Sequence, residues 1–165
     1  MRRNSAAFAV LVGGLIAGAL DITYAVTFSA FHGVPPLRLL QSVASGLLGA
    51  AAYEGGVPTA VLGLVLHFLL MLLIAAIFYF ASRKLPALVQ RAVLWGALYG
   101  FVVYWVMNLV VLPLSAFPGK VRFTSPGLLA INLFVHMFFI GLPIALAARK
   151  AAAYASAAAS SVPST

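Results

Sequence analysis

Four apolar runs dominate this sequence, and each is long enough to cross a lipid bilayer. They cover about 7–30, 57–80, 91–112 and 127–148. An α-helix rises 1.5 Å per residue, so about 20 apolar residues cross the roughly 30 Å hydrocarbon core of a membrane. Hydrophobic residues make up 64% of the chain and charged residues only 7%, which is far from the composition of a soluble domain. The sequence therefore predicts an all-α membrane protein with four transmembrane helices in one bundle.

The first run has an alternative interpretation. A basic start, an apolar stretch and a small-residue segment at 17–19 also fit a cleaved signal peptide. The run continues well past that segment, however, and its GxxxG spacing suits a helix that packs permanently against a neighbour. We therefore expect a retained transmembrane helix.

The connection between the first two runs predicts an additional helix. Pro35 and Pro36 suit the start of a helix, Gly55 and Gly56 suit its end, and residues about 36–52 between them place apolar side chains on one face. Because this segment is too short to span, we expect an interfacial or re-entrant amphipathic helix in the first outer loop. A plain surface helix over the mouth of the bundle is the alternative.

Residues 1–150 are expected to form one transmembrane domain, because 165 residues leave room for a single domain. The segment 151–165 is rich in alanine and serine and ends in SSVPST. We predict that this segment is a disordered tail.

The basic residues indicate the orientation of the chain. One side of the predicted bundle receives Arg2, Arg3, Arg83, Lys84, Arg91, Arg149 and Lys150. The other side receives Arg38, Lys120 and Arg122. The positive-inside rule therefore places both termini in the cytoplasm. Charges at the edges of apolar runs do not form a stripe that tracks phosphates, so the lipid bilayer is the expected partner and nucleic acid is not.

Asp21 lies within the first run and is one of only two acidic residues in the chain. A carboxylate at membrane depth costs roughly 2.5–3.5 kcal/mol on insertion scales, so it normally faces the bundle interior and has a partner. The other spans offer polar residues at similar depths, namely His67, Tyr104, Asn108, Asn132 and His136. We expect these residues to line an outward-facing polar pocket that binds an ion or small polar ligand, for transport or sensing.

Several chemistries suit Asp21, His67 and His136. Two histidines and one carboxylate could hold a metal ion, and the same groups could relay protons. Two histidines at equal depth on different helices could also ligate a haem b through its axial positions. The simplest alternative is structural, in which each buried histidine or carboxylate only forms hydrogen bonds that fix helix packing.

The sequence gives no positive sign of an enzyme. It contains no GxSxG, P-loop, HExxH or dinucleotide-binding motif, and it has no cysteine. A second class of function is therefore a structural one, as an accessory subunit of a membrane complex or as a homo-oligomer.

Two patterns suggest that the four spans are a duplicated helical hairpin. GGLIAGAL in the first span and GALYGFVV in the third both place GxxxG near the cytoplasmic side, and the second and fourth spans each carry one histidine. Two hairpins of parallel topology would be related by a pseudo-two-fold axis along the membrane normal.

Three stretches carry a family resemblance: LLQSVASGLLGAAAYEGG, VLHFLL and YGFVVYWVMNLVVLPLSAF. With them, most of Gly13 to Arg149 resembles a family of small four-span bacterial inner-membrane proteins of unknown function. The resemblance implies a bacterial inner membrane and four helices. It implies no activity and no functional residues.

Overall fold

The structure is a computed structural model, and it describes residues 2–119 and 125–160. The described residues form helices, turns and loops, without a strand. Lys120 and Arg122, which contributed to the predicted orientation, lie outside the described residues.

Four of the helices are long and apolar enough to cross a membrane, as the sequence predicted; they cover Ser5–Phe31, Gly56–Lys84, Ala92–Leu114 and Pro126–Ala157. The first two spans are the single helices α1 (Arg2–Phe31) and α3 (Gly56–Lys84). The third comprises α5 (Ala92–Val106), the π-helical segment η2 (Met107–Val111) and α6 (Leu112–Leu114). The fourth comprises α7 (Pro126–Val135), the π-helical segment η3 (His136–Gly141) and α8 (Leu142–Ser160).

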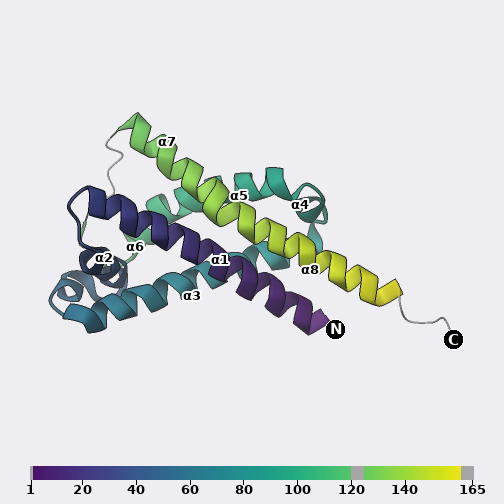
Figure 1. The fold of residues 1–165 in the computed structure, drawn as a ribbon, viewed down its shortest axis with the longest axis horizontal. Helices are drawn as coiled ribbons and strands as arrows, with labels where there is room; N and C mark the ends of the chain where they lie inside the picture. Colours follow the sequence, from purple (N-terminus) through teal and green to yellow (C-terminus); the bar gives the residue numbers. More distant parts are fainter. Residues whose placement is uncertain (1, 120–124, 161–165) are drawn as a thin grey trace.

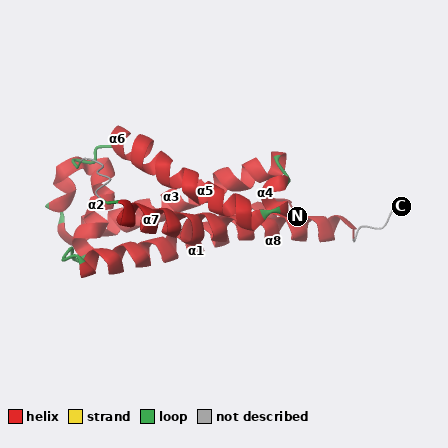
Figure 2. Ribbon diagram, turned by 90° about the horizontal axis from the view of Figure 1, so that it is seen from above, coloured by secondary structure: helices red, strands yellow, loops and turns green. Residues whose placement is uncertain are grey.

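The helices lie along one long axis, with α1 between α3 and the continuous α7–η3–α8 helix (Figure 1). α5 packs on the other side of η3 and α8. Both described ends of the chain lie at the end of the bundle where the short helix α4 (Ala87–Gln90) connects α3 to α5 (Figure 2). We call this the α4 end, and we call the opposite end, where α2 lies, the α2 end.

Glycines allow the spans to approach closely in two pairs. A Cβ atom added at Gly14 would lie 3.1 Å from the Cα atom of Leu72 on α3. A Cβ atom added at Gly96 would lie 2.9 Å from the carbonyl oxygen of Gly141. The two GxxxG patterns therefore mark helix contacts, α1 with α3 and α5 with the fourth span.

Both π-helical segments precede a proline. Pro113 follows η2 and Pro143 follows η3, each after one leucine. Proline has no backbone N–H and its ring clashes with the carbonyl four residues earlier, so an unbroken α-helical hydrogen-bond pattern is not available there. A wider π turn absorbs this defect within a continuous helix, and such turns are frequent at functional sites.

The outer-loop helix predicted over 36–52 is present as α2 (Pro36–Leu48) and the 3₁₀ segment η1 (Gly49–Tyr53). Gln41 of α2 is buried, and its side-chain amide donates a 3.0 Å hydrogen bond to the carbonyl of Gly56. Ala116 N–H donates to the Gly46 carbonyl at 2.9 Å, which ties the loop after α6 to the same helix. α2 is therefore fixed across one end of the bundle.

The predicted disorder from residue 151 is wrong for the described part of the tail. α8 continues to Ser160, and Ala151 is completely buried. The ring of Tyr154 lies edge-to-face on Phe8 of α1 at 5.8 Å. Alanine has the highest helix propensity, so an alanine-rich segment that begins against a neighbouring helix extends that helix. Residues 161–165 lie outside the described residues.

Candidate functional site

Asp21 lies on α1, roughly 15 Å from the end of the helix at Phe31. Its side chain is half-buried. It interacts electrostatically with His136 and, more weakly, with His67. The structure therefore brings Asp21 into electrostatic range of both histidines predicted for the site, each on a different span.

His136 begins the π-helical segment η3 and faces the third span. Its Nδ1 donates a 2.9 Å hydrogen bond to the Asn132 carbonyl, one turn earlier on the same helix. Its ring lies edge-to-face against the buried ring of Tyr104, at 5.1 Å between centroids. Because Nδ1 carries the proton in this bond, neutral His136 presents the lone pair of Nε2 as a base.

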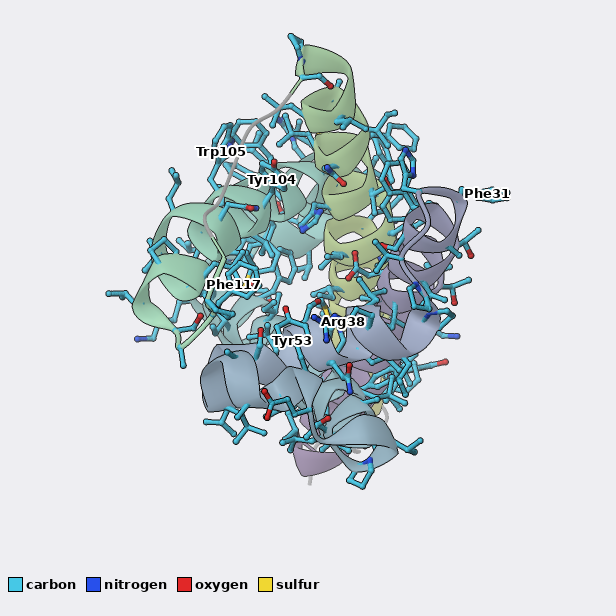
Figure 3. All side chains as sticks on the ribbon, turned by 90° about the vertical axis from the view of Figure 1, so that its left-hand side faces the viewer. Phe31, Arg38, Tyr53, Tyr104, Trp105 and Phe117 are labelled. Carbon is cyan, nitrogen blue, oxygen red and sulfur yellow. The ribbon has the colours of Figure 1, made fainter. Side chains whose placement is uncertain are left out.

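Glycine sets the distance between Tyr104 and His136. A Cβ atom at Gly100 would collide with the carbonyl oxygen of His136, and it would lie 2.6 Å from the Cα atom of Met137. Gly100 therefore brings α5 into backbone contact with η3, and Tyr104 follows one turn later on the same face. Viewed from the α2 end, Tyr104 projects from α5 toward the fourth span (Figure 3).

Tyr24 belongs to the same group of residues, although the sequence analysis did not select it. Its hydroxyl donates a 3.4 Å hydrogen bond to Oδ1 of Asn132, which joins α1 to α7. The spacing of three residues from Asp21, which places both on one helical face, was the available signal. We define the polar cluster as Asp21, Tyr24, Tyr104, Asn132 and His136.

Asn108 follows Tyr104 by one helical turn, and among the described residues its side chain forms no hydrogen bond to another span. Its Nδ2 donates a 2.8 Å hydrogen bond to the carbonyl of Tyr104, within the same helix and at the start of η2. The predicted site residue therefore satisfies a carbonyl of its own helix next to a π turn.

α1 lies between His67 and His136, the predicted site residue of the fourth span. It is buried, and its Nε2 donates a 3.0 Å hydrogen bond to the Gly18 carbonyl of α1. The sequence placed His67 and His136 in equivalent positions, but the structure does not. His67 joins the first two spans, and His136 lies between the third and fourth.

The metal and haem hypotheses do not fit this arrangement. Within residues 2–119 and 125–160, no group of three His, Cys, Asp or Glu side chains is close enough to hold a metal ion. α1 packs against both α3 and η3 and therefore occupies the space that a porphyrin between His67 and His136 would need (Figure 1). The electrostatic interaction of Asp21 with the two histidines does not imply a shared metal ion, because it acts over distances much longer than a metal–ligand bond of about 2 Å.

Three grooves of the described bundle are lined by residues other than the six predicted for an outward-facing pocket. A groove of about 480 Å³ runs along α1 toward the α2 end, and its lining includes Thr23, Tyr24 and Phe139. Of the polar cluster, only Tyr24 contributes to it. At the α2 end itself, the Arg38 guanidinium lies 3.9 Å over the Tyr53 ring, and both residues lie near the centre of the view along the bundle (Figure 3).

The fold and cluster define a four-span helical membrane protein with ionisable groups inside the bundle. No protein-family model matches the chain, and no match was found among curated proteins or solved structures.

Proposed function

We propose that this protein lies in a bacterial inner membrane, with both termini in the cytoplasm, and binds a proton at Asp21 and His136. The charge asymmetry supports the orientation, because Arg83, Lys84, Arg91, Arg149 and Lys150 all belong to the α4 end. Reversible binding at this position suits a transporter or a sensor.

The observation that carries this proposal is the pairing of an acid with a base inside the bundle. Asp21 interacts electrostatically with His136, and among the described residues no hydrogen bond to the Asp21 carboxyl or to Nε2 of His136 is found. A carboxylate and an imidazole that share a low-dielectric site exchange or share a proton readily, because each stabilises the charged form of the other.

The test uses infrared difference spectroscopy on the protein in lipid nanodiscs. The chain has two side-chain carboxyls, Asp21 and the exposed Glu54. One variant of each residue is therefore enough to assign the infrared carboxyl bands. We expect a carboxyl band that responds to pH, because the carboxyl and the imidazole share the proton. Asp21→Asn should remove this band, and the matched control Glu54→Gln should retain it.

Proteoliposomes loaded with a pH-sensitive dye then distinguish transport from binding alone. Proton movement that Asp21→Asn abolishes and Glu54→Gln preserves indicates transport. A band without movement indicates a sensor. If the Asp21 carboxyl does not respond to pH, the proposal is wrong.

A structural role is the second candidate, and the Tyr24–Asn132 hydrogen bond favours it. In that case the polar cluster only stabilises the packing of α1 against α7. The protein would then be an accessory subunit of a membrane complex or one copy of a homo-oligomer. Asp21→Asn would then change stability or the oligomeric state, measured by native mass spectrometry, without changing any pH response.

A further inference from the structure

A groove of about 530 Å³ opens at the α4 end, between α5 and the fourth span. Its lining includes Gln90, Arg91, Leu94, Ala97, Phe138 and Arg149. The basic residues lie near the end of the bundle, and Phe138 lies deeper along the fourth span. One groove therefore combines a cationic mouth with an apolar interior.

The guanidinium groups of the two arginines have no carboxylate partner among the described residues. Arg91 and Arg149 are both exposed, and neither side chain forms a hydrogen bond or ion pair with another described residue. The two acidic residues of the chain are Asp21, inside the bundle, and Glu54, after η1 at the α2 end. Two guanidiniums from different helices thus converge on one groove with their charge unbalanced.

The start of α5 adds to the positive potential at the mouth. Arg91 is the N-cap residue of this 15-residue helix, and no side chain caps it. The amides of the first helical turn have no acceptor within the helix, and the helix dipole places partial positive charge there. Both effects favour a phosphate group between Arg91 and Arg149.

The depth of the groove suits an acyl chain. Phe138 and Arg149 belong to the same continuous helix and lie roughly 16 Å apart along its axis, by the rise of 1.5 Å per residue. Between these levels Leu94 and Ala97 form the facing wall on α5. A soluble phosphate would use only the mouth, and a neutral lipid would use only the wall.

We propose that this groove binds one anionic phospholipid, with its phosphate at Arg91 and Arg149 and an acyl chain along Ala97 and Phe138. Basic pockets between transmembrane helices bind anionic headgroups in this manner. The proposal requires only that the bundle spans a bilayer, and it does not depend on the Asp21 site.

The test is native mass spectrometry of the purified protein in detergent, titrated with phosphatidylglycerol or phosphatidylcholine of the same acyl chains. We expect phosphatidylglycerol to bind roughly 30-fold more tightly than phosphatidylcholine. Each basic residue near a membrane surface increases the affinity for an anionic lipid about fivefold, and two arginines act here. Arg91→Gln with Arg149→Gln should abolish this preference. The control Arg83→Gln, at the same end on α3, should retain it.

A second variant tests the apolar part of the groove. Ala97→Phe fills the wall without changing charge, and it should weaken the binding of both lipids while thermal unfolding confirms that the bundle is intact. Inorganic phosphate should compete poorly. Equal binding of the two lipids to the unmodified protein would overturn the proposal, and so would full competition by inorganic phosphate.

Discussion

The two helix pairs differ in how each uses its histidine. In the first pair, His67 of α3 donates to the Gly18 carbonyl of α1 and is buried. In the second pair, His136 donates within its own helix and lies against Tyr104 at the start of a π turn. His67 joins two regular helices through a hydrogen bond, and His136 presents a basic nitrogen beside a π turn. Similar positions of two histidines in the sequence of their spans therefore do not give equal chemistry.

The largest expected difference between the pairs comes from their glycines. Gly100→Ala should destabilise the protein by about 3 kcal/mol, because the new methyl group would collide with the backbone at His136. Gly18→Ala should cost about 1 kcal/mol, because its nearest neighbour, 2.8 Å away, is the ring of Phe68, which can rotate. Reversible unfolding in mixed micelles measures both. Equal losses would show that the two pairs are equally tight.

The histidines themselves sharpen the comparison. His67→Ala should cost about 2 kcal/mol, since it removes a buried ring and an interhelical hydrogen bond. His136→Ala should cost about 1 kcal/mol, because its bond stays within one helix. The exposed His32 is the control, and His32→Ala should change little. A larger loss of unfolding free energy for His136→Ala than for His67→Ala would show that His136, and not His67, stabilises the packing of the helices.

The smallest effect concerns two tyrosines on α5. The Tyr99 hydroxyl donates a 2.7 Å hydrogen bond to the Ile74 carbonyl of α3, so Tyr99→Phe should cost about 0.6 kcal/mol. The Tyr104 ring lies against His136, and the phenyl group of Tyr104→Phe keeps that contact. Its unfolding free energy should therefore stay within about 0.5 kcal/mol of the original. The same micelle assay measures both, and a cost at Tyr104 above that at Tyr99 would contradict this ranking.

Hydropathy was sufficient to predict the four spans and the extra helix at the α2 end. The polar residues were also predicted, because a carboxylate such as Asp21 cannot face lipid without cost. The order of the helices around the bundle was not accessible. A stripe on one helix shows which side is buried but not which neighbour it meets, so the position of α1 between His67 and His136 was missed. Tyr24 was missed because a tyrosine near a membrane surface is equally typical of an interfacial anchor.

The contact between the first and last helices has a consequence for biosynthesis. A Cβ atom added at Gly13 of α1 would lie 3.2 Å from the Cα atom of Ile144 on α8, yet most of the chain separates these two residues. Ribosomes add roughly 5–20 residues per second, so α1 waits seconds in the membrane before its final neighbour emerges. During that interval α3 is the long helix that can cover the glycine face of α1. A truncated chain that ends before the fourth span would leave Gly13 facing lipid and expose it to quality-control proteases.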